Sequence, residues 1–444
     1  MKLNRRDVLK LAGLTMFSTA TSGLVGFLKG AKATNRRIIV IGAGMAGLAA
    51  AGRLQAAGAE VIVLEARDRI GGRVHTDYTL AEHPVELGAE YIHGDGVPTW
   101  DLLESAGLDE TLATLNDDRN FAVYTDDRLL RYPETFDLDG WALIERLENA
   151  SRRPRHDISL AEWLGGDVPA WVNHIIASDY AADIDQLSLL GHLEATYAGD
   201  GEGDFRIVAG YGRLVEWMAN GLDIRRNSPV ERIEYDADSA TVVTNSATLQ
   251  ADAVIVTLPL GVLKAGDVIF DPPLPVSKQE AISGLGAGAV NKIILKFDAP
   301  FWDASLEALV TELQTQLWWR AGWGRGDEAP ILTALIGGRS GANLSAMPDD
   351  AVIDIALSDL SRMFRRNDLV SRLVEGRFVN WGADPYSRMG YSYVPVGSAG
   401  QRASLASPVG RTLYFAGEAA SITHPATVHG AILSGWRAAD EVSR

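Results

Sequence analysis

Three glycines and one acidic residue have the types and spacing of a dinucleotide-binding site. Gly42, Gly44 and Gly47 form a G-x-G-x-x-G pattern, and Glu65 follows 23 positions after the first glycine. The first glycine permits a tight turn, the second lets the backbone approach a pyrophosphate, and the third lets a helix pack closely. Glu65 could then accept hydrogen bonds from the ribose of an adenosine. The alternative is a glycine-rich turn without a ligand.

The elements around this pattern favour the dinucleotide site. Ile38–Ile41 is a β-branched run typical of a buried strand, Ala46–Ala57 is an Ala/Leu-rich helical run that ends at Gly58, and Glu60–Leu64 is a second strand. The helix N-terminus presents free N–H groups and a partial positive charge to phosphates. This strand–helix–strand unit predicts a Rossmann-type α/β fold, but it does not choose between NAD and FAD.

Composition narrows the function classes. With 444 residues the chain exceeds one ordinary core, so two domains are expected. The net charge of −17 argues against nucleic acid or an anionic membrane as a partner and suits a small cationic substrate, although a merely soluble acidic surface is the commoner explanation. No cysteine is present, which excludes disulfides, thiolate catalysis and a cysteinyl-linked flavin. The eight histidines show no spacing such as H-x₃-H, so no metal is expected.

Residues 1–33 have the pattern of a targeting segment. Arg5 and Arg6 form a twin-arginine pair, an apolar run follows from Leu11 to Leu28, and Ala31-Lys32-Ala33 is a small-x-small cleavage site. We therefore expect the twin-arginine export machinery as a partner, a mature start at Thr34, and a periplasmic protein without stable membrane association. A transmembrane anchor is the alternative.

The residues after Glu65 add a family resemblance. The stretch Glu65 to Arg73 reads E-A-R-D-R-I-G-G-R, which resembles the flavin-containing amine oxidase family, where the cofactor is FAD. The resemblance implies that Arg73 and the backbone of Gly71 and Gly72 reach toward the pyrophosphate and the flavin. For Arg67, a cofactor contact and plain surface charge stay open as alternatives.

The C-terminal part carries further matches. Residues 380–394 closely resemble the W-x-A-D-P-[WY]-x-R-x-x-Y-S-Y pattern of polyamine oxidases and flavin-dependent histone demethylases, which implies that Trp381 packs on the flavin and Tyr391 forms a wall of the substrate site. Glu418 is implied to lie on the ribityl–pyrophosphate part of FAD. A helix that begins at Thr427 and Val428 would stabilise negative charge on the flavin carbonyl.

Matches in the middle of the chain concern three other residues. Residues 88–94 read G-A-E-Y-I-H-G and are similar to the G-A-x-W-I-H-G of animal polyamine oxidases, whose His faces the substrate; here it is His93, with a structural His as the alternative. Val230 is implied to contact adenine through its amide. Lys292 follows Asn291 as in the family, where a Lys reaches flavin N5 through a water; a strand Lys at the surface is the alternative, and for Lys296 the better one.

Departures from the family pattern bear on the substrate. Gly390 stands where monoamine oxidases carry a flavin-bearing Cys, Thr427 where they carry a second Tyr, and His424 where the demethylases carry a Tyr. These residues favour noncovalent FAD and a slender, extended amine. Glu202, in the acidic loop 200–204, could face a polyamine ammonium, although such a loop is more often a solvated turn.

The expected site residues fall into three sets. For FAD binding they are Gly42, Gly44, Ala46, Gly47, Glu65, Ala66, Arg67, Gly72, Arg73, Gly88, Ala89, Val230, Trp381, Gly417, Glu418, Thr427 and Val428. For catalysis they are Lys292, His93, Tyr391 and Thr427. For substrate binding they are His93, Glu202, Tyr391 and His424.

The fold expected from the resemblance is α/β, with a discontinuous Rossmann-type FAD-binding domain and an interleaved α+β substrate-binding domain. Its boundaries follow from the order of the motifs. They are 34–96, 206–297 and 380–444 for the FAD domain and 97–205 and 298–379 for the substrate domain.

The expected function is FAD-dependent oxidation of spermidine or spermine. A hydride passes from the carbon beside a neutral amine nitrogen to flavin N5, the imine hydrolyses to an aldehyde and a shorter amine, and O₂ reoxidises the flavin to give H₂O₂. An L-amino-acid oxidase is the second hypothesis, but it needs an Arg to bind a carboxylate, and the sequence identifies none. A nonenzymatic FAD-binding protein or a module acting on proteins is the third. Which polyamine is used, which C–N bond is cleaved and the oligomeric state stay open.

Overall fold

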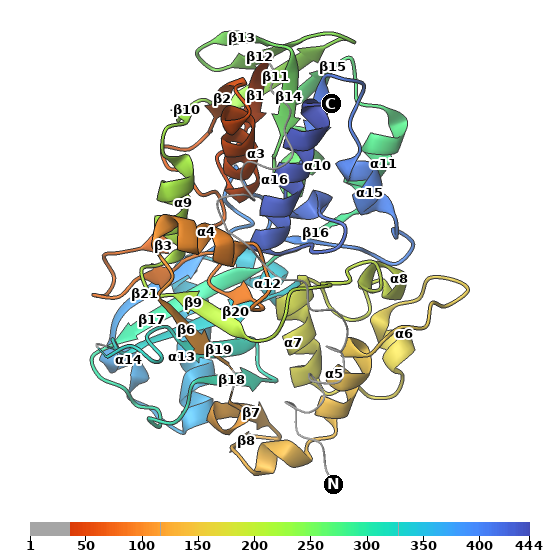
Figure 1. The fold of residues 1–444 in the computed structure, drawn as a ribbon. Coiled ribbons are helices and arrows are strands. Elements are labelled where there is room, and N and C mark those ends of the chain that lie inside the picture. The colour runs from red at the N-terminus through yellow and green to blue at the C-terminus, as the bar shows by residue number, and fades with distance from the viewer. Residues whose placement is uncertain (1–35, 116, 327) are drawn as a thin grey trace.

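Two sheets at opposite ends of the molecule organise the chain (Figure 1). The computed structural model describes residues 36–115, 117–326 and 328–444. The expected targeting segment and its cleavage site lie outside the described residues. Within them, no helix has both the length and the apolar character needed to cross a membrane.

The first sheet has five parallel strands in the order β10-β2-β1-β14-β23. The strands are β1 (Arg37–Ile41), β2 (Glu60–Leu64), β10 (Asp223–Arg225), β14 (Ala253–Val256) and β23 (Leu413–Phe415). The central strands consist of β-branched residues buried on both faces, as a parallel sheet covered on both sides requires. This sheet confirms the predicted α/β class with a Rossmann-type domain.

Helices with small residues cover one face of this sheet. They are α3 (Met45–Ala56), α9 (Tyr211–Ala219) and α16 (Val428–Val442). α3 and α16 lie side by side in Figure 1, and a Cβ on Gly435 would come within 2.2 Å of the carbonyl oxygen of Ala46. The last helix therefore packs directly on the start of the glycine-motif helix, which brings the two ends of the described chain together.

The opposite face carries a smaller sheet and short helices. Its four strands are β11 (Val230–Tyr235), β12 (Ala240–Thr244), β13 (Thr248–Ala251) and β15 (Ile269–Asp271). The helices are α10 (Leu260–Ala265), α11 (Val276–Gly284) and α15 (Gln401–Ala406). Valine and isoleucine side chains from both sheets form one buried cluster between them.

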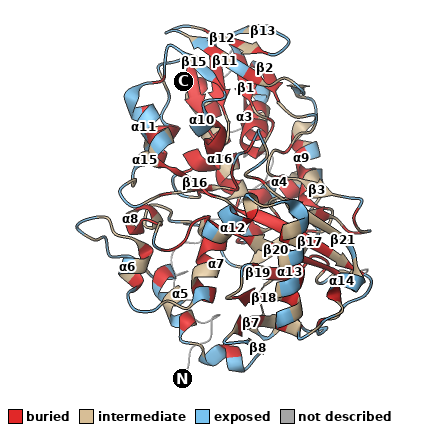
Figure 2. Cartoon of the chain, turned by 180° about the vertical axis from the view of Figure 1, so that it is seen from behind, coloured by how far each residue is buried: buried red, intermediate tan, exposed pale blue. Residues whose placement is uncertain are grey.

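The second large sheet has seven strands in the order β21-β17-β20-β19-β18-β7-β8. They are β7 (Phe121–Thr125), β8 (Arg128–Leu130), β17 (Asn291–Phe297), β18 (Ala308–Thr311), β19 (Leu317–Arg320), β20 (Ile331–Ile336) and β21 (Leu373–Val379). α12 (Gly338–Ser345), α13 (Asp349–Phe364) and α14 (Leu369–Arg372) follow it in the chain, and apolar residues of α13 pack on its core. Figure 2 shows buried residues along these strands, as in the parallel sheet.

Segment 160–181, where the apolar spacing predicts one helix, forms two helices. The run from Leu160 to Ala181 reads as a single amphipathic helix, but the structure has α6 (Leu160–Leu164) and α7 (Ala170–Tyr180). Gly165 ends α6 with a φ of 63°, and Pro169 precedes the first turn of α7. The glycine and proline therefore outweigh the apolar periodicity.

The remaining elements connect the two large sheets. They are β3 (Thr76–Asp77), β4 (Val85–Glu86), β5 (Ile92–His93), α4 (Thr99–Ala106), β6 (Thr111–Thr114), α5 (Gly140–Glu148), α8 (Leu189–His192), β9 (Asp204–Ile207), β16 (Gly286–Ala287) and β22 (Ser392–Tyr393). β9 lies between β5 and β6 in a three-stranded sheet, which brings together segments on both sides of the expected domain boundaries. Those boundaries stay a prediction.

Candidate active site

A cavity of about 1200 Å³ is bounded by both large sheets: on one side by the carboxyl ends of the parallel strands, on the other by β17, β19 and β20. A pocket for one drug-sized ligand typically has about 300–1000 Å³. The cavity therefore has room for a dinucleotide together with a second, smaller molecule.

Nearly all the expected site residues line this cavity. From the FAD set they are Gly42, Gly44, Ala46, Glu65, Ala66, Arg67, Gly72, Arg73, Gly88, Ala89, Val230, Trp381, Gly417, Glu418, Thr427 and Val428, and from the other sets Lys292, His93, Tyr391 and Glu202. Gly47 and His424 are the exceptions. The structure thus brings the expected residues together from distant parts of the chain, while their roles stay predictions.

The glycine motif shapes one end of the cavity. Gly42 has a φ of +103°, which favours glycine, and makes the turn from β1 into α3. A Cβ on Gly47 would come within 1.9 Å of the carbonyl oxygen of Gly42, so this position, although off the cavity wall, requires glycine for packing. The carboxylate of Glu65 accepts hydrogen bonds from the backbone N–H groups of Ala43 (2.8 Å) and Arg67 (2.9 Å), which holds it at the end of β2.

Gly44 provides a test of whether the residues present fit a dinucleotide. Its φ of −79° and ψ of 179° are open to any residue, and a Cβ there would meet nothing closer than 3.9 Å. No side chain caps the N-terminus of α3, and its first turn holds no acidic residue. Free N–H groups beside a position without a Cβ fit a bound pyrophosphate, so the site suits FAD.

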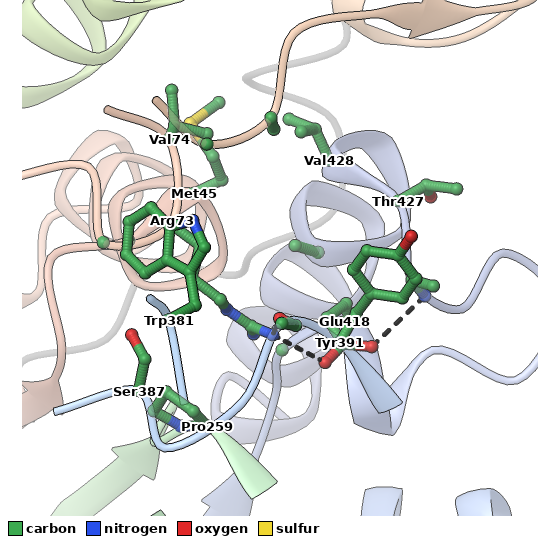
Figure 3. Close-up of a pocket in the computed structure, with 18 of the residues that line it drawn as sticks. Met45, Arg73, Val74, Pro259, Trp381, Ser387, Tyr391, Glu418, Thr427 and Val428 are labelled. Carbon is green, nitrogen blue, oxygen red and sulfur yellow. Dashed lines mark hydrogen bonds and ion pairs between the residues drawn. The ribbon is translucent and has the colours of Figure 1, made fainter. Parts of the chain in front are cut away.

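Glu418 ties the C-terminal segment to the first. Arg73 donates from Nη1 to Glu418 Oε1 (3.0 Å) (Figure 3) and to the carbonyl of Gly390 (2.5 Å). Ser392 Oγ donates to Glu418 Oε2 (2.6 Å). Burial raises the pKa of Glu418, but the charges of Arg73 and Arg402 and these hydrogen bonds outweigh it and leave the pKa below its usual value. The carboxylate is therefore a fixed negative charge beside the cavity.

Trp381, Tyr391 and Thr427 are also fixed by hydrogen bonds. Trp381 donates from Nε1 to the carbonyl of Leu87 (3.2 Å), and the Tyr391 hydroxyl donates to the carbonyl of Ser178. Thr427 caps α16 by accepting from the N–H of Gly430 (2.9 Å). A helix N-terminus therefore lies at the cavity, as expected for this segment.

Lys292 has a partner that the sequence did not reveal. Its Nζ donates to Glu90 Oε2 (2.7 Å) and to the carbonyl of Glu86 (2.9 Å), and both Lys292 and Glu90 are buried. Lys296 instead donates to the carbonyl of Leu80 (2.7 Å) and does not line the cavity. The only indication of this pair in the sequence was an acidic residue, Glu90, in the G-A-E-Y-I-H-G segment, together with a lysine in a predicted strand.

His93 lies opposite Asp204 across the β5–β9 pairing, with 2.6 Å between Nδ1 and Oδ1. Burial lowers the pKa of His93, but the hydrogen bond to Asp204 and its charge outweigh this and leave the pKa above its usual value. The imidazole side chain is 56% exposed and lines the cavity. It can therefore carry a proton close to a bound amine.

Asp204→Asn should lower the pKa of His93, because the neutral amide removes the charge that favours the imidazolium. The titration is measured by NMR of the imidazole protons. The contribution of the pair to stability should be present at low pH and lost as the pH rises through the raised pKa; in Asp204→Asn the charged pair is absent, so this pH-dependent loss should be smaller. An unchanged titration of His93 would contradict the assignment, and His93→Gln serves to identify its signal.

His424 does not contact the cavity. Its Nε2 lies 3.0 Å from Asp200 Oδ1, and the Nε2 of His429 lies 3.1 Å from Oδ2 of the same carboxylate. Among the described residues these three side chains are the one group close enough together to hold a metal ion. A carboxylate between two imidazole N–H donors makes the same contacts without an ion. These contacts fix the loop before β9 to the start of α16. The expectation of no metal stays a prediction, and the position of His424 does not support the expected substrate contact.

Two cavity carboxylates were not identified from the sequence. Besides Asp200, Glu202 and Asp204 of the acidic loop 200–204, Asp118 and Asp179 line the cavity. The charge of Asp179 acts on both His93 and Tyr391. Asp118 and Asp179 come from two separate segments, so no local pattern identified them.

The comparisons with known proteins agree with this geometry. A family model described as "Flavin containing amine oxidoreductase" matches residues 45–443. Polyamine oxidase 4 of Oryza sativa is 33% identical over 439 residues, covering 91% of this chain and 88% of that protein. The human lysine-specific histone demethylase 2 is 30% identical, over 92% of this chain and 53% of its own length. The structure of cyclohexylamine oxidase from Brevibacterium oxydans superimposes with a TM-score of 0.79 at 23% identity, over 92% of this chain and 99% of the other.

Proposed function

The chain belongs to the flavin-containing amine oxidoreductase family, and on that premise we propose that it oxidises polyamines such as spermidine or spermine with O₂ as acceptor. The products are H₂O₂, an aldehyde and a shorter amine. The bound flavin supplies the redox chemistry, while the protein binds and orients the amine. The match to a polyamine oxidase at 33% identity supports the substrate class.

The observation that carries the proposal is the acidic wall around the substrate half of the cavity. Asp118, Asp179, Asp200, Glu202 and Asp204 all line it. A chain of methylenes with several ammonium groups has positive charges spaced along its length, which such a wall stabilises. A monoamine carries a single ammonium and cannot meet carboxylates at several points along the wall.

The same wall disfavours an L-amino-acid oxidase. Among the described residues, the arginines that line the cavity are Arg67, Arg73 and Arg388. Each pairs with a carboxylate on the dinucleotide side: Arg67 with Asp384, Arg73 with Glu418 and Arg388 with Asp267. None lies in the acidic half to bind the carboxylate of an amino acid, which such an enzyme requires.

Noncovalent FAD and export are part of the proposal. The chain has no cysteine, so a thioether to the flavin is excluded, and denaturation should release free FAD into the supernatant.

The twin-arginine segment favours a periplasmic enzyme, whose N-terminal sequence after export should start at Thr34. An exported soluble form that begins at Met1 would contradict the processing.

A peroxide assay tests the substrate class. Spermidine should give a kcat/KM at least about 100-fold above that of butylamine or any L-amino acid, because only the polyamine places two further ammonium groups against the acidic wall; each such charge is worth about 1.4 kcal/mol or more in this setting. Asp179→Asn should raise the KM for spermidine while leaving that for butylamine nearly unchanged. Asp185→Asn, on an exposed residue paired with Arg339, is the control. An amino acid oxidised faster than spermidine would favour the second hypothesis.

A further inference from the structure

We propose that Glu90 is a positioning residue, which holds the ammonium of Lys292 at the wall of the cavity and acts through Lys292 on the redox equilibrium of the bound flavin. The proposal rests on the proposed binding of FAD in this cavity but not on the identity of the amine. It concerns a residue at a variable position of the family-like segment 88–94.

The hydrogen bonds of Lys292 leave one donor for the cavity. An ammonium has three N–H donors. Two of them go to Glu90 Oε2 at 2.7 Å and to the carbonyl of Glu86 at 2.9 Å. Lys292 also lines the cavity, together with Trp381. The two bonds therefore fix the orientation of the ammonium and leave the third donor for a group inside the cavity.

The other oxygen of Glu90 is held equally firmly. Trp319 donates from Nε1 to Glu90 Oε1 at 3.0 Å, and Nε of Arg206 lies 2.9 Å from the same oxygen as an ion pair. Arg206 is itself fixed, because it donates to the Tyr91 hydroxyl at 2.9 Å. Both oxygens of Glu90 thus face donors, and a Gln side chain would have to turn its NH₂ group toward one of them.

The charges explain why the carboxylate matters for Lys292. Burial raises the pKa of Glu90, but the charges of Lys292 and Arg206 and the hydrogen bonds outweigh it, so the pKa lies below its usual value and the group stays an anion. Without this anion, two buried cations would face each other with no counter-ion, which is costly at low effective dielectric. The ammonium would then be displaced or neutralised, and the flavin would lose a positive charge that favours its anionic reduced form.

A double-mutant cycle on the FAD-loaded protein tests this mechanism. The midpoint potential of the flavin is measured by reductive titration in wild type, Glu90→Gln, Lys292→Met and the double variant. Glu90→Gln should lower the equilibrium constant for flavin reduction at least about tenfold, which for a two-electron couple is about 30 mV. In the Lys292→Met background the same change should cause no fall, because the group through which Glu90 acts is gone.

Two results would overturn the proposal. If Glu90→Gln raises the potential equally in both backgrounds, Glu90 acts only as a distant negative charge; if the potential does not change, it has no influence on the flavin. Glu90→Asp keeps the negative charge and should recover part of the fall in midpoint potential. If Glu90→Gln does not fold, Glu90→Asp replaces it in the cycle. Glu307→Gln, at a buried carboxylate that does not line the cavity, should lower thermal stability but leave the potential unchanged. The reductive titration uses no amine, so a result against the role of Glu90 would not bear on the proposed polyamine substrate. A protein that retains no FAD would instead contradict the proposed function.

Discussion

Replacing Gly44 with valine should give a folded protein that has lost FAD. The backbone at Gly44 is in an ordinary extended conformation, and a Cβ there has 3.9 Å to its nearest neighbour, so the folded chain tolerates a side chain. The same side chain points into the space that a pyrophosphate would occupy at the start of α3. We expect the affinity for FAD to fall roughly 100-fold or more, or about 3 kcal/mol.

Flavin absorbance of the purified protein, FAD titration of the apoprotein and thermal unfolding of the apoprotein measure this prediction. Gly47→Ala is the contrasting variant, because its Cβ would lie 1.9 Å from the carbonyl oxygen of Gly42 and must force β1 and α3 apart. Gly47→Ala should therefore destabilise the apoprotein itself, whereas Gly44→Val should unfold at the temperature of wild-type apoprotein. If Gly44→Val retained a full complement of FAD, the pyrophosphate would have to bind elsewhere.

The β1–α3–β2 unit was predictable because its determinants are contiguous. The β-branched runs, the three glycines and Glu65 each act on residues a few positions away, and the observed bounds of β2 coincide with the expected ones. The expected single helix over 160–181 was wrong for a related reason. Gly165 and Pro169 interrupt the helix there, although the apolar periodicity continues across them.

The candidate site was predictable only where a segment resembled a family motif. Glu90 and Lys292 are 202 positions apart, and their ion pair exists because β17 and the loop after β4 meet at the cavity. The same holds for Asp179, which lies near the end of α7 but lines a wall shared with β9. Pairings of this kind depend on tertiary structure, so periodicity and spacing within one segment carry no information about them.

Lys292→Met should lower the kcat/KM for O₂ by roughly 100-fold or more. Its ammonium is held in the cavity by two hydrogen bonds, in a site from which bulk water is largely excluded. A preorganised positive donor in such a place stabilises negative charge that develops when electrons pass to O₂, and removing one such donor costs about 10²–10³ in rate. Methionine keeps most of the volume of the lysine stem while removing the charge.

The two half-reactions distinguish this role from a general loss of structure. Stopped-flow mixing of the reduced enzyme with O₂ should show the large decrease, whereas anaerobic reduction by the amine should slow less, because the proposed amine contacts are the carboxylates of the acidic wall and not Lys292. Lys296→Met serves as the matched control, since Lys296 lies four residues further along β17 on the same face and binds a carbonyl outside the cavity. Equal slowing of both half-reactions in Lys292→Met, or equal effects of the two variants, would mean that the ammonium has no specific role in reoxidation.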